Sequence, residues 1–274
     1  MNDQKEKDPN LQCITAIAPT ICKLMGIAPP ALSDKRFLGE VVEAAKRDGI
    51  ATVEKCLVYA PDAVGLQMYQ DFRSLFDVVL RHAPIAVPLC AVIPPITPVC
   101  FASMFTGAQP RDHGLQKKGK PVLTCDTLFD ALIRAGKRVA IVSVKEQSMD
   151  LIFRKRKIHY FSEPDDQAVT HRTIEIIKSD NYDFIVAYHC EYDDILHEKT
   201  HYCTEAIQAL RNDIAAFTQL ADTMDVIWQR NNRAIVFAPD HGAHIDPESG
   251  KGTHGINIPQ DMHIQHYFGI KGST

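Results

Sequence analysis

The sequence predicts an α/β fold: a three-layer α/β/α sandwich around a mostly parallel central sheet, in a single domain over residues 1–274. Short apolar runs of five or six residues, typical of strands buried on both faces of a sheet, recur along the chain. They alternate with longer segments whose apolar residues recur at helical spacing. Alternating strands and helices of this kind place helices on both faces of a parallel sheet.

The expected elements follow one another in a regular order. Gly26 and Gly136 close two of the helices, since glycine ends helices readily. Residues 144–165 mix charged and aromatic side chains and are interpreted as a small excursion from the fold. In chain order the sequence predicts helices over 19–25 and 34–47, a strand over 56–60, helices over 71–81, 101–105 and 127–135, a strand over 138–143, a helix over 167–178, a strand over 183–188, a helix over 204–230 and a strand over 234–238.

The composition argues against two kinds of partner. Lys and Arg number 30 against 34 Asp and Glu, for a net charge of -4, and only residues 154–157 form a basic run. This balance disfavours a nucleic-acid surface, and the run is typical of a solvated face. No apolar run approaches the ~20 residues that cross a bilayer, and no hydrophobic signal core follows the polar residues 1–10. We therefore expect no membrane association.

The eight cysteines include no CxxC pair, and several lie inside apolar, strand-like runs. That pattern fits buried, reduced thiols better than a disulfide framework. A soluble, cytoplasmic protein is expected, and its oligomeric state stays open.

Ionisable side chains follow the predicted strands where the strands end. Ligands of an open parallel sheet bind beyond the carboxyl ends of its strands, so these side chains are expected to meet. A lone Asp at the end of a strand is also typical of a turn, and an Asp and a His four residues apart could be an exposed pair on a helix. An adjacent Asp-His pair directly after a buried strand is different, because burying two ionisable side chains costs free energy unless they have partners. Carboxylates and imidazoles suit zinc or manganese, so the set predicts two adjacent metal sites. The residues are Asp62, Asp193, His197, Asp240, His241 and His254.

Thr97 lies between two prolines and the short apolar helix expected over 101–105. A hydroxyl just ahead of a helix start lies where unpaired backbone N–H groups and the positive end of the helix dipole converge. Such a hydroxyl can serve only as the N-cap, or it can attack an anion bound there. The metal-ligand candidates elsewhere in the chain favour the second interpretation.

These motifs, in this order, resemble the alkaline phosphatase superfamily and, within it, the type I phosphodiesterase/nucleotide pyrophosphatase branch. The resemblance spans residues 62–254. Thr97, followed by Thr106-Gly107, Pro110 and His113-Gly114, is similar to the nucleophile segment of that family. Its metal motifs are similar to the Asp62 loop, Asp193-x-x-x-His197, Asp240-His241-Gly242 and Thr253-His254-Gly255.

The resemblance implies an alkaline phosphatase-like fold and two divalent metal ions, zinc or alternatively manganese. One ion is expected on Asp193, His197 and His254, and the other on Asp62, Asp240, His241 and Thr97. In this interpretation Thr97 attacks a small-molecule phosphate ester to form a phospho-threonine, which water hydrolyses, as in a metal-dependent phosphodiesterase or phosphomonoesterase. A phosphotransferase or phosphomutase on the same scaffold, or a non-catalytic metal-binding homologue, are the alternatives.

Two positions depart from the family's pattern. Cys100 stands where the phosphodiesterase branch usually has an asparagine that donates to a phosphate oxygen. Phe101 stands where sulfatases have an arginine, and Thr97 stands in place of their modified cysteine or serine, so a sulfatase is disfavoured. The donor to the phosphate is therefore unassigned. The candidates are the backbone N–H groups after Thr97, Lys145, Gln147 and His189.

Overall fold

The central sheet of the computed structural model, which describes residues 11–274, confirms the predicted α/β class. Its eight strands lie in the order β1-β3-β10-β7-β2-β6-β4-β5, and β8 pairs with β9 in a separate ribbon. Within the described residues, β10 runs antiparallel to its neighbours and the other pairings of the main sheet are parallel. The strands are β1 (Gln12–Cys13), β2 (Lys55–Pro61), β3 (Ile85–Cys90), β4 (Val139–Val144), β5 (His159–Glu163), β6 (Phe184–His189), β7 (Arg233–Phe237), β8 (His244–Ile245), β9 (Gly252–Thr253) and β10 (His263–Lys271).

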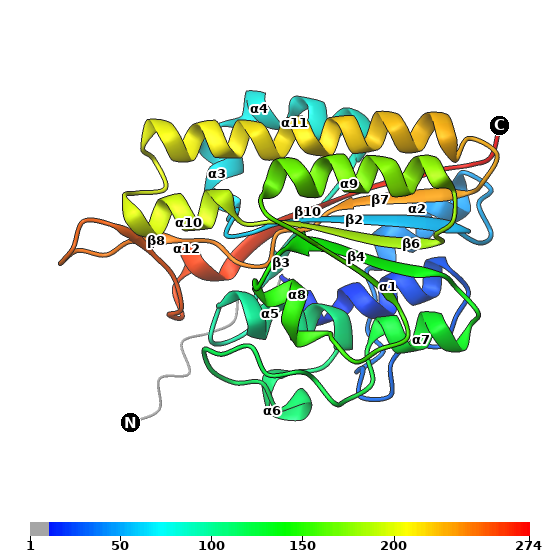
Figure 1. Ribbon diagram of the computed structural model, residues 1–274, viewed down its shortest axis with the longest axis horizontal. Helices are drawn as coiled ribbons and strands as arrows, with labels where there is room; N and C mark the ends of the chain where they lie inside the picture. Colours follow the sequence, from blue (N-terminus) through cyan, green and yellow to red (C-terminus); the bar gives the residue numbers. More distant parts are fainter. Residues whose placement is uncertain (1–10) are drawn as a thin grey trace.

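Helices cover both faces of the sheet, as Figure 1 shows with α9 and α11 above it and α1, α5, α7 and α8 below. Each layer packs on the sheet through its own hydrophobic cluster. One layer holds α3 (Leu66–Asp71), α4 (Arg73–His82), α9 (Asp166–Ser179), α10 (Glu191–Glu198) and α11 (Thr204–Ile227). The other holds α1 (Ile17–Leu24), α2 (Gly39–Arg47), α5 (Thr97–Thr106), α7 (Leu128–Arg134) and α8 (Ser148–Ile152). The short helices α6 (Pro110–His113) and α12 (Pro259–Met262) lie in connecting segments, and a 3₁₀ turn covers Ile14–Ala16.

The four strands predicted from apolar runs are β2, β4, β6 and β7. β2 lies between β6 and β7 and pairs in parallel with both, so the carboxyl ends of these three strands meet at one edge of the sheet. Successive side chains of a strand point to opposite faces. At the end of β6, the Tyr188 ring therefore contacts Phe101 of α5, whereas the His189 ring contacts Tyr59 on the face covered by α9 and α11.

Several predicted helices differ in their bounds. The helix expected over 101–105 is α5, which begins at Thr97, so Thr97 is its first residue and Ile96 is the N-cap. The helix expected over 204–230 is α11, which ends at Ile227.

The helix expected over 71–81 is α4, which begins at Arg73, and a separate helix, α3, ends just before it at Asp71. Phe72 separates the two, because its φ of -124° and ψ of 40° are not helical. The helix expected over 34–47 begins only at Gly39. The Asp34 side chain accepts a hydrogen bond from the Arg36 backbone N–H at 3.0 Å, and Lys35 has a positive φ of 63°. This local turn competes with the helix, as short polar side chains often do.

β3 and β10 complete the sheet but have no counterpart among the predicted strands. Pro88 lies inside β3, and proline argues against a strand because it has no N–H to donate. It is tolerated because β1 pairs with β3 only at Leu89 and Cys90. Residues 144–165, interpreted from the sequence as an excursion, contain α8 and β5, and β5 pairs in parallel with β4 at the edge of the main sheet.

All eight cysteines are free thiols in the structure, in line with the cysteine pattern. None of the helices described over residues 11–274 combines the length and the apolar character needed to cross a membrane.

Candidate metal centre and active site

Two loops meet above the carboxyl ends of β2 and β7. The loop after β2 carries Asp62, and the loop after β7 carries the Asp240-His241 pair. The two backbones come together at Gly65 and Gly242. A Cβ added to Gly242 would lie 2.1 Å from a backbone carbonyl oxygen and 3.0 Å from Gly65 Cα, so only glycine lets the loops approach this closely.

Asp62, Asp240 and His241, which we call the Asp240 cluster, each offer a donor atom within 4.8 Å of the others. His241 Nδ1–H donates to the Gly242 carbonyl oxygen at 3.0 Å, so Nε2 carries a lone pair. That lone pair faces Asp62 Oδ1 at 3.4 Å and Asp240 Oδ2 at 3.3 Å. Asp240 Oδ2 is buried and has no hydrogen-bond partner. A buried carboxylate oxygen that faces a lone pair without a donor, as Asp240 Oδ2 does, is destabilising unless a cation lies beside it, so these residues fit a divalent metal.

Asp193, His197 and His254, which we call the Asp193 cluster, also lie within 4.8 Å of one another. Asp193 and His197 are one turn apart on α10, and His254 follows β9. His254 Nδ1–H donates to the Pro95 carbonyl oxygen at 3.0 Å. Its Nε2 lone pair therefore faces His197 Nε2 at 3.1 Å and Asp193 Oδ1 at 3.5 Å, and Asp193 Oδ1 is again a buried atom without a partner. The same reasoning fits a second divalent metal here.

The two clusters are neighbours, and Thr97 lies beside one of them. The rings of His241 and His254 stack with their centroids 4.0 Å apart. Thr97 is the first residue of α5, and its Oγ1 lies 3.4 Å from Asp62 Oδ1 and 3.3 Å from His241 Nε2. The structure thus brings Thr97 together with the six predicted metal ligands.

Burial shifts the pKa values of both clusters. It raises the pKa of Asp62 and of Asp193 well above the usual range, and the nearby Asp240 carboxylate raises both further. Burial also raises the pKa of Asp240 to about 6, although backbone hydrogen bonds act in the opposite direction. It lowers the pKa of His241 to about 3 and that of His254 to about 2. The imidazoles are therefore neutral at pH 7, which is the form that binds a metal.

Two buried side chains that no sequence motif marks hold the site in place. The Tyr188 hydroxyl donates to Asp62 Oδ2. Asp261, fully buried, accepts hydrogen bonds through Oδ2 from the backbone N–H groups of Gly255 at 2.9 Å and Ile256 at 3.1 Å. Asp261 thereby fixes the loop directly after the last predicted histidine. A single Asp in a loop or a Tyr in a strand is too common in sequences to signal such a role.

The structure shows which of the candidate donors to a phosphate can reach the site. His189 faces the opposite layer of the fold from Thr97, so its ring does not reach the site. Cys100 is fully buried, and its N–H donates to the Ile96 carbonyl oxygen at 3.0 Å. The Val99 N–H donates to the same carbonyl oxygen at 3.0 Å, and Pro98 has no N–H, so the first N–H groups after Thr97 are not free. The N–H of Thr97 itself, which was not among the predicted candidates, lies at the first position of α5, where it has no intrahelical partner.

Comparison with solved structures finds several with the same architecture. Phosphonoacetate hydrolase from Sinorhizobium meliloti 1021, in complex with phosphonoformate, aligns with a TM-score of 0.54 and 17% identity over 72% of this chain and 58% of that one. Murine ectonucleotide pyrophosphatase/phosphodiesterase 5, in complex with AMP, aligns with a TM-score of 0.58 and 14% identity over 71% of this chain and 59% of that one. These neighbours have alkaline phosphatase-like folds, and this chain shares that architecture. The C-terminal periplasmic domain of the phosphoethanolamine transferase EptC from Campylobacter jejuni aligns with a TM-score of 0.55 and 14% identity over 80% of both chains.

At these identities the alkaline phosphatase-like likeness concerns the fold. The aligned part spans 58% of the phosphonoacetate hydrolase and 59% of the murine phosphodiesterase. No protein-family model matches the sequence, and no curated protein matches it. The neighbours are hydrolases and transferases, and this chain shares with them a fold in which buried clusters of Asp and His could hold metal ions.

Proposed function

We propose that this chain is a metal-dependent hydrolase of phosphoric esters that acts through a phospho-threonine at Thr97. The observation that carries the proposal is the position of Thr97 Oγ1 at the N-terminus of α5, 3.4 Å from Asp62 Oδ1 and 3.3 Å from His241 Nε2. A phosphate is attracted to this point by the helix dipole and by the free N–H of the first helical residue. A nucleophile, an anion site and metal-ligand candidates therefore coincide.

Two divalent cations are the proposed cofactors, zinc or alternatively manganese, because the donors are a mixture of nitrogen and oxygen. When bound, such ions supply Lewis-acid chemistry, which lowers the pKa of a hydroxyl or water and neutralises charge on the phosphate. The proposed ligands of one ion are Asp193, His197 and His254, and those of the other are Asp62, Asp240, His241 and Thr97.

The proposed reaction has two displacements at phosphorus. Thr97 Oγ1 first attacks the phosphorus, the Oγ1–P bond forms, the ester P–O bond breaks, and the leaving oxygen takes up a proton. Asp62 Oδ1, the acceptor of the Thr97 hydroxyl at 3.4 Å, lies where that hydroxyl releases its proton. Water then attacks the phosphorus, the Oγ1–P bond breaks, and Thr97 regains a proton. The net reaction consumes one ester and one water and yields an alcohol and a phosphate.

A small-molecule phosphate ester is the proposed substrate class. The Asp193 cluster provides the more open side of the site, because the His197 side chain is 42% exposed whereas that of His241 is fully buried. The ligands in the neighbouring structures, phosphonoformate and AMP, are small organic anions with a phosphonate or phosphate group, which supports this class. The AMP complex of the murine phosphodiesterase was formed with an inactive variant in which a threonine is replaced by alanine, which supports a threonine nucleophile.

Hydrolysis of an aryl phosphate monoester and of the matching diester, with zinc or manganese added, tests the proposal. We expect turnover that disappears in Thr97→Ala while the metal content of that variant stays within one equivalent of wild type. Thr97→Ser, which keeps a hydroxyl, is the matched control and should retain measurable turnover. The ratio of the monoester to the diester rate then identifies the branch. Full activity in Thr97→Ala contradicts the nucleophile, and a metal-loaded protein without any turnover supports a non-catalytic homologue.

A phosphotransferase is a second candidate, favoured by the alignment that covers 80% of both this chain and the transferase domain. The phosphoryl group on Thr97 would then pass to an acceptor hydroxyl in place of water. Turnover that rises with the concentration of an added alcohol, with phosphorylated alcohol as the product, distinguishes transfer from hydrolysis.

A further inference from the structure

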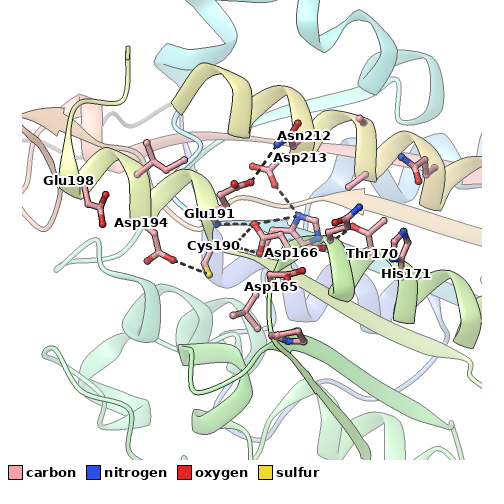
Figure 2. Close-up of a pocket in the computed structure, with 18 residues that line it drawn as sticks. Asp165, Asp166, Thr170, His171, Cys190, Glu191, Asp194, Glu198, Asn212 and Asp213 are labelled. Carbon is pink, nitrogen blue, oxygen red and sulfur yellow. Dashed lines mark hydrogen bonds and ion pairs between the residues drawn. The ribbon is translucent and has the colours of Figure 1, made fainter. Parts of the chain in front are cut away.

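A cavity of about 740 Å³ opens between α9, α10 and α11, on the face of the sheet opposite Thr97 (Figure 2). His189, the last residue of β6, reaches into its lining. α10 separates this cavity from the Asp193 cluster. One side of that helix presents the Asp193 cluster, and another side lines the cavity with Glu191, Asp194 and Glu198. The cavity is therefore a second, distinct polar region of the molecule.

The described lining of this cavity is strongly acidic. It contains no lysine or arginine among the residues that the structure describes, and its only other ionisable side chains besides carboxylates and Cys190 are two histidines. Asp165, Glu191, Asp194 and Glu198 are exposed, whereas Asp166 is half-buried and Asp213 is buried. Negative charge on the two more buried carboxylates is unfavourable unless a proton on His189 or a cation balances it. The carboxylates are Asp165, Asp166, Glu191, Asp194, Glu198 and Asp213.

Three of the lining residues bring metal-type donor atoms together from three different elements. Asp166 of α9, His189 of β6 and Asp213 of α11 each offer one donor atom within 4.8 Å of the others. His189 Nδ1 lies 3.0 Å from Asp213 Oδ1 and 3.8 Å from Asp166 Oδ2. Two carboxylates and one imidazole are also the donor set of the Asp240 cluster, and its ring-nitrogen to carboxylate distances are comparable.

The hydrogen bonds around His189 leave Nδ1 facing carboxylates. The Thr170 hydroxyl donates its single hydrogen to the Asp166 carbonyl oxygen at 3.0 Å, as Thr in a helix commonly does. It therefore accepts from His189 Nε2–H, which lies 3.1 Å away. A neutral ring then presents its Nδ1 lone pair to Asp213, to Asp166 and to the oxygen of the Tyr59 hydroxyl, 2.9 Å away, whose hydrogen is donated to Asp213 Oδ1. Either a second ring proton or a metal ion removes that repulsion.

Asp213 adds a carboxylate oxygen without a donor. Its side chain is 4% exposed, and its Oδ1 accepts a hydrogen bond from the Tyr59 hydroxyl at 2.8 Å. Its Oδ2 accepts no hydrogen bond from the residues over 11–274, although Asp213 lines the cavity. Asp240 Oδ2 and Asp193 Oδ1 are shut off from solvent without a partner, whereas Asp213 Oδ2 is open to the cavity, where water or a cation can reach it.

We propose that Asp166, His189 and Asp213 form a third metal site, for a divalent cation such as Mn²⁺ or Zn²⁺, separate from the two-metal centre. The mixed oxygen and nitrogen donors suit both ions. The cation takes the place of a second ring proton at Nδ1 and balances part of the acidic lining. The cavity supplies the room for water ligands to complete its coordination. This site does not depend on the hydrolase proposal, because none of its residues belongs to the proposed catalytic clusters.

The third site has a structural consequence for the metal centre. The Asp166 carboxylate accepts hydrogen bonds from the backbone N–H groups of Cys190 at 3.0 Å and Glu191 at 2.8 Å, where α10 begins. An ion held by Asp166 and His189 therefore ties the end of β6 to the start of α10. Because α10 presents Asp193 and His197, occupancy of the third site should tighten metal binding at the Asp193 cluster.

Metal stoichiometry in a protein without the other two sites tests the proposal. The variant Asp193→Asn/Asp240→Asn removes a carboxylate ligand from each proposed catalytic site. Equilibrated with Mn²⁺ or with Zn²⁺ and freed of loose metal by gel filtration, it should retain one equivalent by elemental analysis. Adding Asp213→Asn should remove that equivalent, whereas adding Glu198→Gln, which changes another carboxylate of the cavity, should leave it in place. Circular dichroism confirms that each variant is folded.

Magnetic resonance of Mn²⁺ on the double variant gives a second readout that needs no Asp213 variant. The bound ion should show hyperfine coupling to the nitrogen of one imidazole. A double variant that binds no metal overturns the proposal and identifies His189 as a protonated partner of the carboxylates. Retention of the equivalent after Asp213→Asn, or an ion without nitrogen coupling, overturns it as well. Failure of the hydrolase proposal appears instead as absent turnover in wild type and leaves these outcomes unchanged.

Discussion

Asp240→Asn should stabilise the metal-free protein at alkaline pH. Asparagine keeps the shape of the side chain and its Oδ1, which accepts the backbone N–H groups of Ala63 at 3.2 Å and His241 at 3.0 Å. Its new amide group replaces the partnerless Oδ2 and can donate to His241 Nε2, 3.3 Å away. The change also removes one negative charge from a region in which Asp62 and Asp193 are already buried.

The size of this effect follows from the pKa of Asp240. Burial raises that pKa from 3.8 to about 6, a shift of about two units. At about 1.4 kcal/mol per unit, the ionised carboxylate costs the fold ~3 kcal/mol. Because the folded pKa is above the unfolded one, the cost is complete above about pH 6 and disappears as the pH falls through about 6 toward 4. The variant should therefore be more stable than wild type by ~3 kcal/mol at about pH 8 and by almost nothing at about pH 4.

Urea unfolding in the presence of a chelator measures this difference. Wild type and Asp240→Asn are compared by circular dichroism at several pH values between about 4 and 8. Asp77→Asn, which removes a carboxylate from an exposed position of α4, is the matched control and should change the free energy of unfolding by less than ~0.5 kcal/mol at every pH.

Added zinc should reverse the order of stability. A site at a free metal concentration of about 1,000 times its Kd contributes ~4 kcal/mol to wild type. Asp240→Asn has lost a proposed ligand and should gain much less from zinc, with one equivalent less bound by elemental analysis.

Equal or lower stability of Asp240→Asn in chelator at about pH 8 would refute the electrostatic reasoning. A gain that persists unchanged at about pH 4 would refute it too, because the charge is then absent from wild type. An unchanged metal content would remove Asp240 from the proposed ligands.

Two further substitutions probe the geometry of the site. Gly242→Ala should destabilise the protein by at least ~2 kcal/mol in urea unfolding, because its Cβ would lie 2.1 Å from the Gln260 carbonyl oxygen. Gly39→Ala, whose Cβ would have nothing within 4 Å, should be neutral or slightly stabilising. Equal effects would mean that the backbone at Gln260 and Gly65 can move away from Gly242 freely. Asp261→Asn should weaken zinc binding by about tenfold, because it disturbs the carboxylate that accepts two backbone N–H groups beside His254. Competition with a chromophoric chelator measures the affinity. An unchanged affinity would show that other contacts hold the loop.

The sequence by itself determined the fold class and the residues that meet at the candidate metal centre. Both rest on local patterns: an apolar run buried on both faces predicts a strand of a parallel sheet, and polar residues directly after such runs must gather at one edge. Asp62, Asp240 and His241 follow β2 and β7, which are neighbours in the sheet, so position along the chain was sufficient to bring them together. Asp193 and His197 needed only the spacing of one helical turn.

Only the tertiary structure decided which other residues support these sites. Pro88 hid β3 from any strand pattern, and the side chain of Asp261 acquires its role only when it accepts N–H groups from a separate loop. His189 was one of the candidate donors to the phosphate, but the alternation of side chains along β6 turns it to the other face. There it meets Asp166 and Asp213, which no motif connects with it, because their proximity results from the packing of α9 and α11 on the sheet.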